Sequence, residues 1–527
     1  MTVTGTLRMN RGLESSRNEA AFELDEIVVG KDVLELISSA MYVDPMTVYR
    51  EYVQNAADAI DLARQQGNLG EDEPGKVDIS IDPATRTVRI RDNGSGIAWA
   101  DFARRLTALG GSSKRGTSAR GFRGVGRLAG LGYAQELIFR SRVSTEDKVS
   151  ELRWDCRRLK AALRSADDLT GVDGLIRSVA SLHQVDAGDY PSRFFEVELK
   201  GMIRLRSDRL MGANAIAEYL SQVAPVPFSP EFRFGAQITA ALKPYVDLSE
   251  LEIRIEGIEG PVYRPHRDSF EFADKQHIAF NSVQIQEIPG MDGDLAAIAW
   301  VLHHDYEGAV PSATLSKGLR LRSGNVQVGE NNLLEELFPE TRFNSWSVGE
   351  VHIFDRRIVP NGRRDHFEQN PHYHNLINQL TPTAREIARL CRTSSIRRKW
   401  LREFDAHRNA VSEKLDIATQ GSLPGAELQK IVASTEASLS RMESIANMEL
   451  LQDDAPDQLQ PIVFDMRERI GGLSIEETLK TSPLSKMTAT DRSMYERLFS
   501  LVYECSANRI AAKSLVDRMI IKLTNEL

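Results

Sequence analysis

Two short runs in which apolar and polar residues alternate constrain the fold of this chain more than any other feature. They are KVDISID, residues 76–82, and TVRIRD, residues 87–92. A period of two predicts strands, and the short turn between the runs predicts a β-hairpin. The second run leads directly into DNGSGI, residues 92–97, whose glycines allow the backbone to bend sharply and to approach a ligand closely. Alone, this glycine sequence is typical of an ordinary turn.

A helical pattern precedes the hairpin. An Asp-Pro pair at residues 44–45 predicts the start of a helix, and the glycine after Gln66 predicts its end. Within this helix Glu51, Asn55 and Asp58 are separated by four and three residues, so all three side chains lie on one face. Such a face is either a solvated surface or the polar wall of a binding site.

A glycine-rich stretch, residues 109–130, follows the hairpin. In it Gly121, Gly124 and Gly126 precede a helix-like segment, an arrangement that offers bare backbone amides and a positive helix end to a phosphate group. No strand-helix-strand unit precedes these glycines, which counts against a dinucleotide-binding fold.

Composition divides the chain into three parts. The chain has 527 residues, of which 41% are hydrophobic, and a formal net charge of -9, as expected of a core-forming protein with several domains. Helices and antiparallel strands mix without regular alternation, which predicts an α+β sandwich. Prolines near residue 230 predict a boundary, and Thr381 with Pro382 predicts the start of a charged helical region. The predicted domains cover residues 1–230, 231–378 and 379–527.

Several classes of protein are disfavoured by the sequence. No apolar run approaches the roughly 20 residues of a membrane helix, so we expect a cytoplasmic protein without a membrane partner. The mild acidity argues against tight wrapping around nucleic acid. The basic stretch IRRKWL, residues 396–401, is either a contact for a phosphate backbone or a solvated helix face. The three cysteines are expected to be reduced thiols without a metal.

In their order, the polar helix, the DNGSGI turn and the glycine loop resemble the ATP-binding fold of the GHKL superfamily. Its members include gyrase B, the ninety-kilodalton heat-shock chaperones, sensor histidine kinases and the MutL repair proteins. The resemblance covers roughly residues 20–200 and implies a Bergerat-type α/β sandwich that binds ATP with Mg²⁺.

The resemblance also implies roles for single residues. Glu51 matches the general base that activates the attacking water, and Asn55 matches the Mg²⁺ ligand. Asp58 is expected to line the pocket behind them, and Asp92 to accept a hydrogen bond from the adenine amino group. The residues expected beneath the adenine base are Gly94, Gly96 and Ile97.

The glycine-rich stretch resembles a lid and a phosphate loop. Residues 109–120, with Lys114 and Arg115, match the lid that folds over bound nucleotide. The phosphate loop would consist of Gly121, Gly124, Val125 and Gly126. One departure concerns a late strand, where the family has a Gly-Thr pair and this chain has Ser192 and Arg193; Ser192 is a candidate substitute for the threonine hydroxyl.

The second domain resembles the middle domain of the heat-shock chaperones, an α+β domain of ribosomal-S5-like type. The match ends at NGRRD, residues 361–365, where Arg364 falls on the arginine that reaches the γ-phosphate. Arg363 replaces a serine of the family and is an alternative for this role. A MutL-like interpretation would assign the role to Lys317 instead.

Taken together, the resemblances imply an ATP-hydrolysing, homodimeric clamp like the heat-shock-90 chaperones, which would close on protein clients. The histidine kinase branch is set aside, because the ATPase-like domain comes first and no phosphorylated histidine segment precedes it. One alternative is a GHKL clamp acting on DNA, like MutL or the microrchidia ATPases. Another is a component of a bacterial stress-response or phage-defence system.

Overall fold

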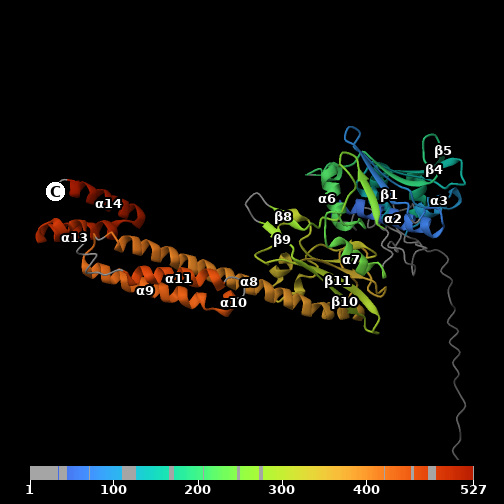
Figure 1. Cartoon of the computed structure of the whole chain (residues 1–527). Coiled ribbons are helices and arrows are strands. Elements are labelled where there is room, and N and C mark those ends of the chain that lie inside the picture. Colours follow the sequence, from blue (N-terminus) through green and yellow to red (C-terminus); the bar gives the residue numbers. More distant parts are fainter. Residues whose placement is uncertain are drawn as a thin grey trace, which may run out of the picture.

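A computed structural model gives the arrangement of the chain. It describes residues 34, 44–70, 72–109, 126–164, 171–205, 207–245, 250–271, 277–420, 422–452, 456–472 and 482–525. Figure 1 shows two sheet-containing domains at one end of the molecule and a helical arm that leads away from them to the C-terminus. Among the described residues, no helix combines the length and the apolar character that a membrane crossing requires.

The first domain is built on a seven-stranded sheet with the strand order β5-β4-β3-β6-β2-β1-β7. Its strands are β1 (Gly75–Asp82), β2 (Thr87–Asp92), β3 (Glu136–Arg142), β4 (Lys148–Asp155), β5 (Ala180–Asp186), β6 (Phe194–Lys200) and β7 (Leu251–Ile255). The predicted hairpin is confirmed as β1 and β2, which pair antiparallel. Strand β7 follows residue 230 in the sequence, yet it pairs in parallel with β1 and completes the sheet.

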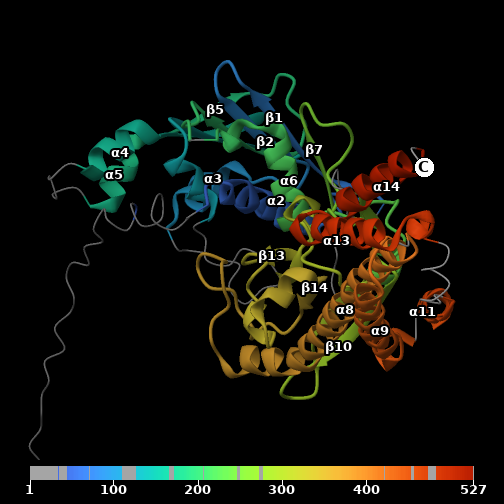
Figure 2. The same ribbon diagram turned by 90° about the vertical axis from the view of Figure 1, so that its left-hand side faces the viewer.

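Helices cover one face of this sheet. They include α2 (Thr47–Gln65), α3 (Trp99–Thr107) and α6 (Ala213–Val223), which Figure 2 shows on the same side of the strands. Two shorter helices, α4 (Cys156–Arg164) and α5 (Val172–Val179), lie near β3 and β5. The predicted helix is confirmed as α2, and the residue after its C-cap, Gly67, has a φ of 70°, a left-handed conformation that favours glycine.

The other face of the first sheet carries a row of ionisable side chains that we call the charge ladder. Each strand contributes one residue, and each residue is the direct register partner of the next. From β5 to β7 the members are His183, Glu151, Arg140, Glu196, Arg91, Asp78 and Arg254. Opposite charges on directly paired residues stabilise a sheet and disfavour a shifted register.

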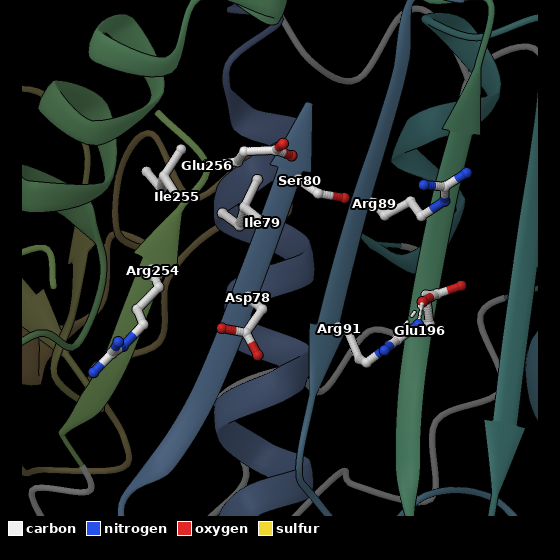
Figure 3. A pocket seen from close by; sticks show the side chains of 9 residues that line it. All are labelled: Asp78, Ile79, Ser80, Arg89, Arg91, Glu196, Arg254, Ile255 and Glu256. Atoms are coloured by element: carbon white, nitrogen blue, oxygen red, sulfur yellow. Dashed lines mark hydrogen bonds and ion pairs between the residues drawn. The ribbon is translucent and has the colours of Figure 1, made fainter. Parts of the chain in front are cut away.

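A pocket of about 410 Å³ lies over the charge ladder between β7 and β6. Figure 3 shows Arg254, Asp78, Arg91 and Glu196 lining it, with helix α2 behind the strands. The pocket therefore lies on the face of the sheet away from the predicted nucleotide site. Arg91 and Glu196 form an ion pair of 2.6 Å across two strands, whereas Arg254 pairs with Glu252 of its own strand.

The middle domain contains a five-stranded sheet with the order β10-β11-β14-β12-β13. These strands are β10 (Ser282–Pro289), β11 (Leu295–His303), β12 (Gly318–Ser323), β13 (Val326–Val328) and β14 (Val348–Ile353). One face packs against the first turns of the long helix α8 (Pro371–Ala418). The other face packs against α7 (Gly235–Leu242) and the aromatic segment before it.

A group of charged residues is buried in this domain, and we call it the Glu350 cluster. Glu350 accepts from Arg264 Nη1 at 2.5 Å and from Arg322 Nε at 2.6 Å, and it lies 3.0 Å from His352 Nε2. The side chains of all four residues are 1% exposed. Arg322 also donates to the backbone carbonyls of residues 222 and 224 at the end of α6. The cluster therefore connects the middle domain to the first.

Helix α8 runs from the middle domain into the helical arm, and it begins earlier than predicted. It begins at Pro371, where Asn370 Oδ1 accepts from the backbone N–H of Tyr373, and Pro382 lies inside it. The predicted start at Thr381 is wrong, because buried residues at helical spacing from Tyr373 to Cys391 hold both sides of Pro382 on the middle sheet. This packing outweighs the cost of a proline inside a helix.

The remaining helices complete the arm. α9 (Gly425–Ala446) and α11 (Pro456–Gly471) pack along the second half of α8 around an apolar core. A terminal helical hairpin consists of α13 (Ala489–Cys505) and α14 (Arg509–Asn525). The prediction of a mostly helical C-terminal region is confirmed.

Candidate nucleotide site

The candidate site begins with one side of helix α2. The Glu51 side chain is 12% exposed, and Asn55 is likewise partly exposed one turn further along the helix. Asp58 lies deeper and is buried. The alternation of polar and apolar residues in α2 therefore leaves a carboxylate and an amide on the accessible edge, with a second carboxylate behind them.

The end of the glycine loop meets this edge. Gly126 begins the 3₁₀ helix η2 (Gly126–Gly132), and a Cβ atom added to Gly126 would overlap Glu51 Oε2. Helix η2 is tied to α2 by Tyr52, whose hydroxyl accepts from the N–H of Gly130 at 2.9 Å. The segment after the glycines was predicted to be helix-like, and in the structure it is a 3₁₀ helix. Glycine is required here because only a bare backbone can approach the carboxylate so closely.

Other residues of the predicted lid and phosphate loop lie outside the described residues. They are Lys114, Arg115, Gly121, Gly124 and Val125. Their roles stay predictions.

The Asp92 turn forms a second wall of the site. Asp92 is buried, and its Oδ1 accepts from the N–H of Gly94 at 2.9 Å. Burial raises the pKa of Asp92 to about 7, whereas the N–H of Gly94 and the charge of Arg193 act in the opposite direction. A Cβ added to Gly94 would lie 2.7 Å from Ala59 on α2, so this glycine allows the turn to lie directly against the helix.

The far side of the turn is held by a hydroxyl that sequence reasoning missed. Gly96 has a φ of 66°, and the N–H of Ile97 donates to Ser141 Oγ at 2.7 Å. Ser141 is fully buried and donates in turn to the carbonyl of Phe194. Ser192, the candidate for a supporting hydroxyl, is exposed instead. Nothing in the sequence around Ser141 distinguishes it from a solvent-facing strand residue.

The middle domain reaches the same site through the predicted arginine loop. Arg50 Nη2 lies 3.1 Å from Glu51 Oε1 and donates to the backbone carbonyl of Arg363 at 3.1 Å. Arg364 is buried and adopts a positive φ of 55°, whereas the Arg363 side chain is exposed. Gly329 holds the loop in place, because its backbone N–H donates to the backbone carbonyl of Arg364 at 2.9 Å.

Arg50 was missed because it lies one residue before Glu51, and therefore about 100° away from the polar face that the spacing predicted. Lys317, the alternative from the MutL-like interpretation, forms an isolated bridge with Val348 beside β12. The loop at residues 361–365 is therefore the part of the middle domain that contacts the residue next to Glu51.

The arrangement fits a magnesium nucleotide. Gly126 leaves backbone next to Glu51 where a side chain would block access, and Arg193 Nη1 is buried without a hydrogen bond to another described residue. Within the described ranges, no group of three or more His, Cys, Asp or Glu residues could hold a metal ion. Mg²⁺ bound through phosphates needs only one or two protein ligands, and the partly exposed side chain of Asn55 could supply one of them.

Known proteins resemble the segment of the chain that contains this site. Residues 43–170 match the family described as histidine kinase-, DNA gyrase B- and HSP90-like ATPase. The chaperone protein HtpG of Polaromonas naphthalenivorans is 27% identical over 195 residues, which cover 34% of this chain and 30% of that protein. HtpG of Halorhodospira halophila is 36% identical over 90 residues, covering 16% and 14%.

A third relative, HtpG of Legionella pneumophila strain Lens, is 27% identical over 135 residues, covering 23% of this chain and 22% of the chaperone. The chain thus matches less than a third of the length of each of these relatives. The match includes the helix, the Asp92 turn and the glycine loop that form the site. The chain therefore carries a GHKL ATPase domain and is related to the HSP90-like proteins of that superfamily.

Proposed function

We propose that the protein is an ATP-hydrolysing clamp whose middle domain senses the state of the nucleotide site. The observation that supports this most directly is the contact of Arg50 with both Glu51 and the carbonyl of Arg363. A guanidinium shared in this way links a catalytic carboxylate to a loop from another domain. Movement of that loop would change the position of Arg50, and with it the orientation of Glu51.

The roles of the residues follow from their places in the site. Glu51 accepts a proton from the attacking water, and Asp92 accepts a hydrogen bond from the amino group of adenine. Asn55 would hold Mg²⁺, which neutralises phosphate charge when it is bound. Arg364 supplies a positive charge from the middle domain, where charge develops during phosphoryl transfer.

The closing motion requires a second copy of the chain, and the terminal hairpin supports this part of the proposal. Helix α13 exposes Met494, Leu498 and Leu501, with exposed fractions of 59%, 41% and 46%. These residues are spaced by four and three and therefore form one apolar stripe. Ile510 and Ile521 on α14 are also exposed. A homodimer would cover these side chains, and sedimentation of the chain with Leu498→Glu would then report a monomer.

An ATPase assay tests the proposal. We expect Glu51→Ala to lower turnover by about 10²-fold to 10⁴-fold, the usual contribution of a general base, while nucleotide binding is retained. Arg364→Ala should also lower turnover without abolishing binding. Glu436→Ala, an exposed position on α9, is a control for loss of a carboxylate. Undiminished turnover in both site variants would contradict the proposed chemistry.

The substrate of the clamp is proposed to be unfolded protein, since the relatives named above are chaperones. Suppression of the aggregation of a thermally unfolded model protein, in the presence of ATP, would support this. A clamp that closes on DNA is the second candidate function. The exposed Arg and Lys residues of α8 between residues 385 and 402 favour it. DNA-stimulated turnover with a steep dependence on salt would identify that function.

A further inference from the structure

Helix α8 carries a concentration of basic residues where it leaves the middle domain. Between residues 385 and 402 there are seven Arg or Lys residues and one Glu, in a chain whose formal net charge is -9. Six of the seven are arginines. The nucleotide site does not use any of them, because it is built from α2, the Asp92 turn and the 361–365 loop.

Four of these residues form a line that we call the basic ridge. Its members are Arg385, Arg389, Arg392 and Lys399, and all are exposed. Their spacing of four, three and seven residues places them along one side of the helix. At a rise of 1.5 Å per residue the ridge is about 21 Å long. The neighbouring Arg342, from the turn that packs on α8, is also exposed.

Two of the acidic side chains beside the ridge are ion-paired, and a third, Glu386, is exposed on the helix next to Arg385. Glu340 lies 2.5 Å from Arg342 and 2.8 Å from Arg392, so one carboxylate is shared by two guanidiniums. Glu403, which follows the ridge along the helix, pairs with Arg441 at 2.7 Å. Arg385, Arg389 and Lys399 have no ion pair with any other residue that the structure describes. The ridge therefore presents a net positive field to solvent.

Aromatic side chains stiffen the same surface. Arg392 lies over the ring of Phe343 and Lys399 over that of Trp400, at 5.9 and 5.2 Å from the ring centroids. Arg398 lies over Trp346 at 5.7 Å. Contacts of this kind restrict long side chains, so less conformational entropy is lost when their charged ends bind a ligand.

From this surface we infer that the basic ridge binds the phosphate backbone of a nucleic acid. A linear array of positive charges matches a polymer with regularly spaced phosphates, and arginine pairs with phosphate in a bidentate manner. A membrane surface fits less well, because the apolar residues of α8 from Ile387 to Cys391 are buried against the middle sheet, and Ile396, which is 47% exposed, is too little apolar surface to anchor the helix in lipid. The inference concerns binding alone and does not depend on ATP hydrolysis.

Fluorescence anisotropy with a labelled 30-base-pair DNA duplex, the whole 527-residue chain and no nucleotide tests the inference. We expect the dissociation constant to rise with salt, with a logarithmic slope of about 3 to 4, because each neutralised phosphate contributes about 0.9. The quadruple variant R385Q/R389Q/R392Q/K399Q should bind at least about tenfold more weakly and lose most of that slope. Replacing one residue should lower the slope by about 1.

The matched control removes the same charge elsewhere in the arm. It is K430Q/R467Q/R469Q/R518Q, four exposed basic positions on α9, α11 and α14. Binding that weakens equally in both variants would overturn the ridge as a site. Binding only to vesicles with 30% phosphatidylserine, or only to polyglutamate, would also overturn it. Both variants should keep the wild-type circular dichroism melt and basal ATPase rate, so a loss of binding cannot arise from unfolding.

Discussion

The two sheets of this molecule both carry charged residues, but they place them in different surroundings. In the first domain the charge ladder joins exposed and buried residues: the side chain of Arg91 is 37% exposed, whereas those of Arg140 and Glu196 are 9% and 1% exposed. In the middle domain the Glu350 cluster is enclosed, with Arg264 and Arg322 each 1% exposed. Ion pairs that remain in water are worth little energy, whereas a buried pair cannot lose one partner without leaving a charge in an apolar medium.

The comparison separates two uses of an ion pair. On the first sheet, alternating charges identify which strand residues belong opposite one another, so the exposed pairs act mainly on register, and a contribution to stability is expected only near the buried Arg140. In the middle domain Arg322 holds Glu350 and also the carbonyls at the end of α6. The buried cluster therefore ties the middle domain to the end of α6 in the first domain.

The largest effect is expected at the centre of the buried cluster. Glu350→Ala removes the carboxylate that Arg264 and Arg322 share, and leaves two buried guanidiniums without a countercharge. We expect a loss of about 3–5 kcal/mol in the free energy of unfolding. Urea denaturation of the full chain at pH 7 measures this loss. Glu350→Gln, which keeps the volume, should lose nearly as much; a loss below about 1 kcal/mol in both would contradict the role of the charge.

Acid should weaken the same region before it affects the ladder. Burial lowers the pKa of His266 to about 3 and that of His352 to about 4. The positive charges of Arg264 and Arg322 also lower both pKa values, whereas the negative charge of Glu350 raises them. The unfolded chain therefore takes up protons below its ordinary histidine pKa of 6.5, while the folded chain does not. Stability is fully present above pH 6.5 and falls towards pH 4, by roughly 1.4 kcal/mol per pH unit for each histidine.

Thermal melts between pH 8 and pH 4.5 check the sign of this effect. The double variant H266Q/H352Q should show a shallower decline, because its side chains at these positions do not titrate. A decline as steep as that of the natural chain would assign the acid sensitivity to other groups.

The smallest effects are expected on the charge ladder, and they should depend on position. Arg140 lies in the middle of the sheet with its side chain 9% exposed, where it pairs with Glu151, Glu196 and Glu198. We expect Arg140→Ala to cost roughly 2 kcal/mol of unfolding free energy, since three carboxylates then face one another. Arg254→Ala at the sheet edge should stay within about 0.5 kcal/mol. Equal losses in urea melts would remove the distinction between centre and edge.

Local pattern was enough to predict much of the fold. Period-two alternation predicted β1 and β2, a proline and a glycine predicted the ends of α2, and both predictions are confirmed. The pattern could not place β7 beside β1, because pairing between strands about 170 positions apart depends on tertiary packing. For the same reason the start of α8 was misplaced, since the sheet that holds its first turns is formed by distant residues.

The residues of the candidate site also divide into those that local sequence motifs predict and those that only the structure reveals. Glu51, Asn55 and Asp92 lie in local motifs and could be proposed from spacing together with a family resemblance. Arg50 and Ser141 could not, because their importance depends on partners from other segments, the carbonyl of Arg363 and the N–H of Ile97. Helical or strand periodicity indicates which face of an element a residue lies on, but not which other segment of the chain packs against that face.

The length of helix α8 determines how far a small rotation at one end moves the other end. Its first turns belong to the middle domain and its last turns to the arm, and its 48 residues extend over about 72 Å without interruption. Such a helix acts as a lever whose short end is clamped to the middle sheet. A pivot of about 5° at that end would carry the far tip through roughly 6 Å, so a minor adjustment beside the arginine loop becomes a visible displacement near the C-terminus.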